Sequence, residues 1–410
     1  MSAYVYLGNA AGAKGRIDIE GGALNAGSIT LGNAAGATGT VVQTGGNVTL
    51  SGGLTMTQAA GGSRYSMSGD TTSVNAPAWP GLALAHGNVF EQDGGTSTVR
   101  FVEFQNSPVA APTVRLKKGT MNITYADGIK HTQADSRCIF EMGSNGIAVI
   151  NETAAGTLLT AGGYSGGSVS PRIFRGCGAV RFTGQLQNYG QVVADGWDGA
   201  EERDLDLTSF TSVTNDNGTS PVRGWWAVNK ARLRLPAIAV ASGNNAYSWG
   251  EPDSDATPDA VNSMRLIFSN AAAGTLDIAL LAPGRAELGA TTGSIIGLWQ
   301  LSPSGSLAFD SLSMAIRYDN AAAAGLGLTE SALKLFKTVG NSWVDVSTLP
   351  GVTVTVNTTT KILTASGLSS CSYFAVGTGV SGEMGVMSMG MAVSGEPAPE
   401  RPKGVLIVVQ

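Results

Sequence analysis

Histidine and cysteine carry much of the nucleophilic and metal-dependent chemistry of proteins, and this chain has few of either. The histidines are His86 and His131, and neither has a second histidine or a cysteine at metal-ligand spacing. Cys138, Cys177 and Cys371 form no CxxC pair, and no serine or cysteine occupies a nucleophile elbow. We expect histidines at turns or on the surface and cysteines buried as small hydrophobic side chains. One disulfide between two of the cysteines is also compatible with the sequence.

Paired carboxylates are the second kind of chemistry that the sequence offers. Hydrolysis of a glycosidic bond needs two carboxylates about 5–9.5 Å apart. Asp195 with Asp198, or Glu201 with Glu202, would supply such a pair on an outer groove. The tryptophans that could stack on sugar rings are Trp197, Trp225 and Trp226. Trp225 and Trp226 are adjacent, so on a strand they point to opposite faces and only one could meet a ligand. We favour packing in a core or interface for these tryptophans.

Two acidic stretches, 251–259 and 195–206, have the composition of calcium loops. Neither has the Asp-x-Asp-x-Asp-Gly order followed by a distal glutamate that an EF-hand requires. We interpret both as solvated loops, and the sequence predicts no cofactor and no metal.

The composition favours many short strands joined by tight turns. Glycine accounts for 57 of 410 residues, about twice the ordinary share of about 7%. Charged residues are 13%, while hydrophobic residues reach 43%, enough to form a buried core. The net charge is −5 and the densest basic cluster is 115–118, which argues against a nucleic-acid partner. No stretch of about 20 apolar residues predicts a membrane span, and the first residues lack the pattern of a signal peptide.

A repeat of 24 positions organises the start of the chain. Leu7–Ala13 returns as Leu31–Ala37, and the glycines and alternating apolar residues between the copies follow the same spacing. This period predicts a β-solenoid. We expect a right-handed parallel β-helix of about eight to ten coils over 1–235, starting regular and becoming irregular. Asn9 and Asn33 occupy equivalent positions, where they would form an amide ladder or act simply as turn residues.

The remaining chain predicts a second domain and a tail. We expect a linker or loop at 236–261, an antiparallel immunoglobulin-like β-sandwich at 262–379, and a flexible Met- and Pro-rich tail at 380–410. The fold class is therefore all-β. The tail ends in five consecutive apolar residues, which would pair with an edge of the same sandwich or of a neighbouring molecule. These residues are Val405, Leu406, Ile407, Val408 and Val409.

Two segments resemble parts of known proteins. The unit at 31–46 resembles the glycine-rich strand repeats of large exported bacterial proteins, such as autotransporter-associated repeats and the surface proteins of planctomycetes and verrucomicrobia. The segment from 331 to 377 is similar to a sandwich module near the C-termini of such proteins. Together the matches cover about half of the chain. The resemblance implies an extracellular or cell-surface location and supplies no catalytic residues. The chain lacks the signal peptide, translocator barrel and sorting helix of that pattern.

These observations favour a non-enzymatic extracellular structural protein that assembles with itself into a filament or surface layer. The first repeat has no polar cap, and the chain ends in an apolar strand suited to donation into a neighbour. The candidate assembly residues are Leu7, Asn9, Leu31, Asn33 and the apolar strand 405–409. The alternatives are a carbohydrate-binding or polysaccharide-degrading β-helix, and an adhesin that presents the loops Pro77–Gly81 and Asp195–Asp206. Surface glycans are therefore a second class of partner.

Overall fold

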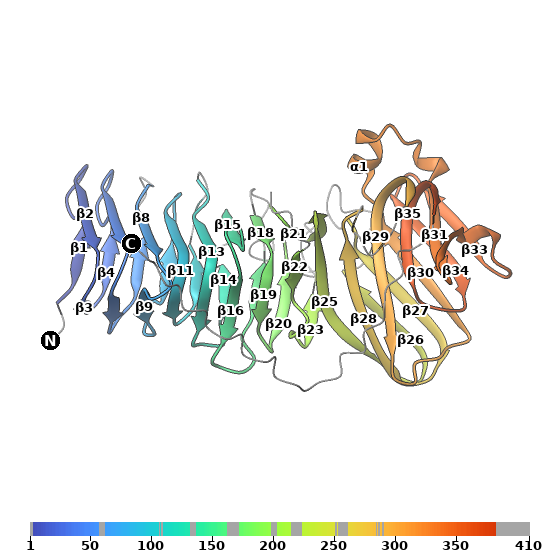
Figure 1. Cartoon of the computed structure of the whole chain (residues 1–410), viewed down its shortest axis with the longest axis horizontal. Coiled ribbons are helices and arrows are strands. Elements are labelled where there is room, and N and C mark those ends of the chain that lie inside the picture. The colour runs from blue at the N-terminus through green and yellow to red at the C-terminus, as the bar shows by residue number, and fades with distance from the viewer. Residues whose placement is uncertain are drawn as a thin grey trace, which may run out of the picture.

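The chain forms an elongated β-structure whose strands stack along the long axis of the molecule (Figure 1). The computed structural model describes residues 3–56, 62–105, 107, 110–131, 137–161, 172–197, 203–214, 224–250, 252, 261–283, 285, 288 and 291–382. The terminal strand 405–409 lies outside these residues. No described helix is long and apolar enough to cross a membrane.

The first part is a parallel β-solenoid whose coils each contribute a strand to a nine-stranded sheet. This sheet consists of β1 (Val5–Leu7), β4 (Ile29–Leu31), β7 (Leu54–Met56), β10 (Leu82–Leu84), β12 (Val102–Phe104), β14 (Ile129–His131), β17 (Leu159–Ala161), β20 (Gln185–Asn188) and β23 (Ser212–Thr214). The second face of the coils consists of β2 (Lys14–Ile19), β5 (Thr38–Gln43), β8 (Arg64–Ser68), β11 (Val89–Val99), β13 (Thr113–Ile123), β15 (Cys138–Met142), β18 (Arg172–Gly176), β21 (Gln191–Asp195) and β24 (Trp225–Asn229). The third contains β3 (Ala23–Ala26), β6 (Asn47–Leu50), β9 (Ser73–Ala76), the later halves of β11 and β13, β16 (Ala148–Glu152), β19 (Gly178–Arg181), β22 (Arg203–Asp206) and β25 (Ala231–Val240).

The coils stack in the register that the repeat predicts. Val5 lies opposite Ile29, and Ile17 lies opposite Val41, each 24 residues apart. Side chains alternate between buried and half-buried along β5, so one face of the strand turns inward. Glycine is required where a strand approaches the next face closely. A Cβ on Gly39 would lie 2.9 Å from the Cα of Leu31.

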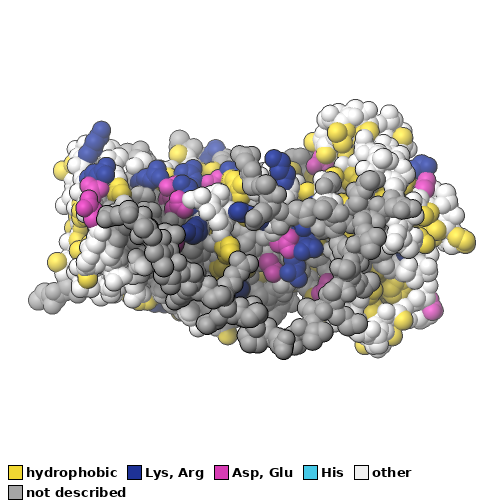
Figure 2. All heavy atoms as spheres, viewed as in Figure 1, with side chains coloured by type: hydrophobic (Ala, Val, Ile, Leu, Met, Phe, Trp, Pro, Cys, Tyr) yellow, Lys and Arg dark blue, Asp and Glu magenta, His cyan; other side chains and the backbone are white. Residues whose placement is uncertain are grey.

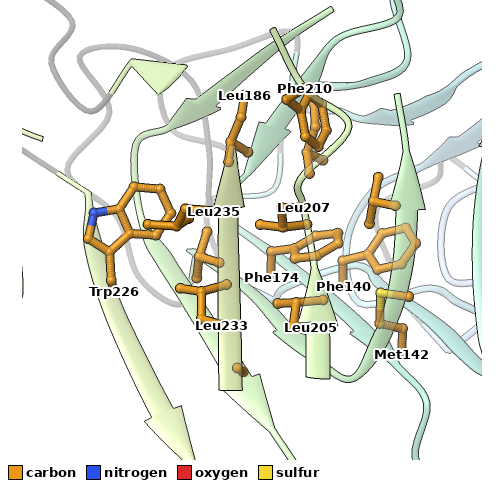
Figure 3. Close-up of a cluster of buried hydrophobic side chains, with 14 of the residues drawn as sticks. Phe140, Met142, Phe174, Leu186, Leu205, Leu207, Phe210, Trp226, Leu233 and Leu235 are labelled. Atoms are coloured by element: carbon orange, nitrogen blue, oxygen red, sulfur yellow. The ribbon is translucent and has the colours of Figure 1, made fainter. Parts of the chain in front are cut away.

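One column of inward residues runs the length of the solenoid. Its members pair from coil to coil in the order Ile17, Val41, Tyr65, Phe90, Val114, Phe140, Phe174, Val192 and Trp226. Two pairs of rings within it are stacked, Tyr65 on Phe90 at 5.7 Å and Phe140 on Phe174 at 5.1 Å between centroids. Figure 3 shows the later part of this core, where Leu205, Leu207 and Leu233 surround the rings. The column keeps its inward direction although its residue types change from aliphatic to aromatic.

The second part consists of two antiparallel sheets. One continues from β25 through β28 (Gly274–Leu281), β29 (Thr292–Ser304), β35 (Tyr373–Ser381), β31 (Lys334–Val339) and β32 (Ser342–Asp345). The other contains β26 (Gly243–Trp249), β27 (Met264–Ala271), β30 (Ser311–Arg317), β34 (Ile362–Leu368) and β33 (Thr353–Asn357). The short helical segments are α1 (Asn320–Gly325) and the 3-10 turns η2 (Glu330–Ala332) and η3 (Val346–Thr348). The expected fold class, a parallel β-helix followed by an antiparallel β-sandwich, is confirmed.

Strand β25 joins the two parts without a linker. It pairs in parallel with β22 of the solenoid and antiparallel with β28 of the second part. One hydrophobic core runs through both parts, and at the junction Trp226 Nε1 donates a hydrogen bond to the carbonyl oxygen of Trp249. The β25–β28 register shifts between Leu235 and Ile238, which tolerates a proline at 236 that has no N–H to donate.

The expected linker at 236–261 is therefore wrong for 236–249, where the structure has the end of β25 and all of β26. The proline at 236 lies at a bulge within a continuing strand, whereas its residue type alone predicts the end of a strand. Of the acidic stretch 251–259, only Pro252 is among the described residues.

Candidate functional surfaces

His131 and Cys138 form a buried pair that resembles a nucleophilic dyad in composition. The Cys138 Sγ lies 3.7 Å from the His131 Nε2, and Phe104 stacks on the imidazole ring at 5.1 Å. Burial, together with the nearby Arg172 charge, lowers the pKa of His131 to about 3. Burial also raises the pKa of Cys138 to about 12. Both groups are therefore neutral at pH 7, and the pair does not hold the thiolate that nucleophilic attack requires. The expectation of a surface or turn position is wrong for His131, because it points into the core.

The other histidine and cysteines behave more simply. His86 occupies a turn with φ 51°, as expected. Cys177 is buried and its thiol donates to the Gly143 carbonyl oxygen at 3.4 Å, while Cys371 is only half-buried. All three cysteines are free thiols, so the structure contains no disulfide between them.

The carboxylates considered for hydrolysis do not form a groove pair among the described residues. Asp195 is 7% exposed, and its Oδ1 accepts hydrogen bonds from the Trp197 backbone N–H and from Asn229 Nδ2. This carboxylate therefore shapes a turn. Asp198, Glu201 and Glu202 lie outside the described residues, so the loop Asp195–Asp206 is described only at its two ends.

The three tryptophans follow the expected preference for packing. Trp226 is fully buried, whereas its neighbour Trp225 is half-buried on the opposite face of β24. Trp197 donates its indole N–H to the Met142 carbonyl oxygen, and the Arg175 guanidinium lies 5.0 Å from its ring centroid. Trp197 therefore contacts the solenoid through both its indole N–H and its ring.

The predicted assembly residues lie at the first coil. Leu7 pairs with Leu31 between β1 and β4. The amide of Asn33 donates to the Asn9 Oδ1 at 2.7 Å, which is the contact that one rung of an amide ladder would make. The remaining assembly residues, Val405, Leu406, Ile407, Val408 and Val409, lie outside the described part of the chain.

The first coil leaves its inward residues incompletely covered. Half-buried residues of this coil are Val5, Leu7, Ile17 and Leu24. Their partners in the next coil are all 0% exposed: Ile29, Leu31, Val41 and Val48. We call the uncovered side of this coil the end face. Each strand of the end face pairs with only one described strand, so one edge of each strand has no partner within the described residues.

Charged side chains of alternating sign follow the outer wall of the middle coils. Arg64 lies 2.7 Å from Glu91, and Arg115 bridges Glu91 at 3.8 Å and Glu141 at 2.8 Å. Arg175 continues the series by pairing with Glu141. Figure 2 shows basic and acidic side chains adjacent on the visible face, with no large patch of one sign. This charge ladder was not predicted from the sequence, although the charges alternate in sign at roughly the spacing of one coil.

Lys117 adds a third cation to Glu91, at 3.1 Å. Burial alone would raise the pKa of Glu91, but Lys117 and Arg64 outweigh it and hold the pKa below its ordinary value. Glu91 is therefore ionised at neutral pH and joins neighbouring coils through its two oxygens.

Three aromatic residues at successive corners form a second feature that was not predicted from the sequence. We define the aromatic corner as Trp79, Phe101 and Tyr125 with the cations Arg100 and Lys130. Trp79 is 62% exposed and Tyr125 43% exposed, while Phe101 is buried between them. Ring centroids are 5.3 Å apart for Trp79 and Phe101, and 6.4 Å for Phe101 and Tyr125. The rings follow one another by 22 and 24 residues, close to one coil, which is the signal that would have revealed them.

A hollow of about 710 Å³ is lined mainly by residues of β25, β28 and β29. Its lining includes Arg232, Arg234, Asp277, Gln300 and Ser302. Both arginines are paired, Arg232 with Asp204 at 2.6 Å and Arg234 with Asp206 at 3.2 Å. The hollow is therefore polar, and its strongest charges are balanced by partners on the solenoid.

No protein-family model, curated protein or solved structure matches this chain. The resemblance to exported glycine-rich repeat proteins therefore stays a prediction. Among the described residues, no group of three or more histidine, cysteine or acidic side chains could hold a metal ion.

Proposed function

We propose that this protein is a non-enzymatic structural protein that assembles with itself through the end face. The observation that carries the proposal is the half-burial of the inward residues Val5, Leu7, Ile17 and Leu24, whose partners one coil further are fully buried. Apolar surface and unpaired strand edges together favour the addition of a further β-layer. A second copy supplies that layer.

A glycine in the first coil supports the same conclusion. Gly45 has no room for a side chain, because its Cβ would lie 2.2 Å from the Glu20 carbonyl oxygen in the preceding coil. Gly21 occupies the equivalent position of the first coil, has no positive φ, and would meet nothing within 4 Å. The fold of one molecule therefore does not require glycine at Gly21. Close approach of another coil would require it.

The geometry of the molecule favours a two-fold dimer as the first product. The end face lies at the opposite end of the solenoid from the antiparallel sheets (Figure 1). At that other end, β25 pairs with β28, so the third face of the last coil continues into an antiparallel sheet. Among the described residues, the first coil is the end of the solenoid that leaves inward residues half-buried, and face-to-face stacking of two such ends gives closed two-fold symmetry. Growth into a filament or layer needs a second contact, for which donation of the strand 405–409 remains our proposal, as does the extracellular location.

Substitution of Gly21 by alanine tests stacking without disturbing the monomer. We expect sedimentation velocity to show a concentration-dependent dimer for the natural chain and a monomer for Gly21→Ala, with thermal unfolding unchanged. Gly325→Ala is the matched control, because Gly325 also has nothing within 4 Å and lies in α1, far along the chain. Dimers that persist in Gly21→Ala would overturn stacking through this coil.

The edge of β1 offers a second test through the backbone. The Val5 N–H bonds to the Ser28 carbonyl oxygen, so the alternation of parallel pairing turns the Tyr6 N–H toward the open edge. Tyr6→Pro removes that donor and should abolish the dimer. Tyr6→Ala keeps the N–H and should retain it. Equal loss in both variants would assign the effect to the tyrosine ring and contradict strand pairing.

A further inference from the structure

We propose that the aromatic corner binds a polysaccharide that carries carboxylate groups, with Trp79 as the stacking surface and Arg100 as the carboxylate ligand. This binding role goes beyond assembly and uses a different part of the molecule. The site is built from three successive corners of the solenoid, between β9 and β10, between β11 and β12, and between β13 and β14.

Backbone hydrogen bonds fix the three corners against one another. The Arg100 N–H donates to the Ala76 carbonyl oxygen, and the Leu82 N–H donates to that of Phe101. Gly81 brings the tryptophan loop directly beside Arg100, because a Cβ on this glycine would lie 3.2 Å from the Arg100 Cβ. The site is therefore preformed on rigid elements, which lowers the entropy lost on binding.

Trp79 offers an exposed apolar ring that packs on a buried aromatic residue. Its indole is 62% exposed and meets the buried Phe101 ring edge-on. Large exposed aromatic rings are uncommon on a solvated surface and mark binding sites when polar groups surround them. The C–H face of a sugar ring is an apolar surface of matching shape, and its hydroxyls suit polar groups at the rim.

The electrostatics of the corner select a negatively charged ligand. Lys130 is already paired, at 2.6 Å from Asp127 and 3.9 Å from Glu103. Arg100 forms no ion pair with any described residue, and its guanidinium lies 4.2 Å from the Tyr125 ring centroid. Its Nε is buried and has no hydrogen-bond partner among the described residues. An external carboxylate cannot reach this buried nitrogen, but Arg100 as a whole is only half-buried. The terminal nitrogens of its planar guanidinium fit a carboxylate with two hydrogen bonds.

The arrangement along the rod favours a chain of sugars over a single one. Trp79 and Tyr125 are two coils apart, about 10 Å at the usual strand spacing. A polysaccharide lying along the solenoid axis would meet the Trp79 ring on one coil and the Arg100 guanidinium on the next. Uronic acids are the sugars that present both an apolar ring face and a carboxylate. We therefore assign the ligand to the uronate polysaccharides.

Isothermal titration calorimetry at low ionic strength tests the proposal with the full chain. The probes are tetramers of galacturonate, mannuronate and hyaluronan, with the methyl ester of galacturonate tetramer as the uncharged match. We expect at least one acidic tetramer to bind and its binding to weaken about tenfold when the carboxylate is masked. No binding of any acidic tetramer, or equal binding of acid and ester, would overturn the proposal.

Substitutions then place the binding at this corner. Trp79→Ala and Arg100→Gln should each weaken binding of the acidic tetramer about tenfold or more. Arg100→Lys should restore binding only partly, because lysine keeps the charge but lacks the planar guanidinium.

Tyr4→Ala is the control, since Tyr4 is 66% exposed on the first coil. Gly21→Ala should bind normally, which separates this proposal from assembly. Unchanged binding in both Trp79→Ala and Arg100→Gln would place the ligand elsewhere.

Discussion

The first two coils and the middle coils of the solenoid use the same architecture with different chemistry. In the first two coils, Leu7–Ala13 recurs letter for letter as Leu31–Ala37, and the contacts are glycines, small side chains and one asparagine pair. In residues 64–197 the sequence no longer repeats, but the strands keep the parallel register. There the column of core residues becomes aromatic, and the outer wall carries charge and exposed rings. Register, and not repetition of residue types, is therefore what the fold preserves.

The difference has a physical reason. In the regular coils, close approach of backbones excludes most side chains at the corners, as the Gly45 contact illustrates. In the middle coils, tightly packed glycines such as Gly128 and Gly176 persist, but the corners vary in length and other corner positions carry large side chains. Each large side chain then meets its counterpart one coil away, which produces stacked rings and paired charges. Charged and aromatic side chains are therefore concentrated where the sequence repeat becomes irregular.

The largest effect should come from removing a stacked ring in the middle coils. Phe140 is 2% exposed and packs on Phe174. Phe140→Ala should lower the free energy of unfolding by about 3–5 kcal/mol. Val41→Ala, in the same column of the regular coils, should cost about 2 kcal/mol, because less apolar volume is lost. Urea unfolding compares the two. Equal losses would show that the aromatic column adds nothing beyond the aliphatic one.

The next effect separates two equivalent glycines of the regular coils. Gly45→Ala should destabilise the chain by about 2–3 kcal/mol, because the new Cβ would overlap the Glu20 carbonyl oxygen. Gly21→Ala should change the stability of the monomer by less than about 0.5 kcal/mol. Thermal unfolding at a concentration below dimerisation makes the comparison. Similar losses in both variants would contradict the inference that only the stacked coil needs glycine.

A smaller effect should come from the charge ladder of the middle coils. Glu91→Gln removes the charge that Arg64, Arg115 and Lys117 share, and should cost about 1–2 kcal/mol at pH 7. The pKa of Glu91 is lower folded than unfolded, so its contribution is present above its unfolded pKa of about 4.3 and lost as pH falls through the folded value.

Stability of the natural chain and of Glu91→Gln, measured between pH 7 and pH 3, should therefore converge at the acidic end. The exposed pair Arg16–Asp18 of the first coil provides the control, and Asp18→Asn should change stability less than Glu91→Gln does. A difference between Glu91→Gln and the natural chain that stays constant with pH would rule out an electrostatic origin.

The smallest effect concerns the asparagine rung of the regular coils. Asn33→Ala removes an exposed hydrogen bond and should cost about 0.5 kcal/mol. Asn9→Ala should cost a similar amount, and the double variant should cost less than the sum, because both single variants remove the same bond. Strict additivity in this cycle would show that each asparagine acts separately as a turn residue.

Sequence patterns predicted some of this structure well and other parts poorly. The spacing of Leu7 and Leu31 predicted their pairing, and the adjacency of Trp225 and Trp226 predicted that they face opposite sides. The domain boundary predicted at Pro236 was wrong, because a proline at a bulge and a proline in a linker look alike in sequence. His131 misled for a similar reason, since a single histidine carries no periodic signal that reveals burial.

Local backbone features and contacts between coils differ in how far the sequence determines them. The sequence itself determined the strand-rich composition, the coil period, the inward alternation and the glycine corners, because these are local constraints on backbone shape. Only the tertiary structure decided which residues meet across coils, since the spacing between paired residues of neighbouring coils varies from 18 to 34. Stacking brings the Trp79 loop beside Arg100 at Gly81, and it brings Glu91 beside Arg115. Contacts of this kind depend on which residues of neighbouring coils lie opposite one another. That register depends on the length of every preceding coil.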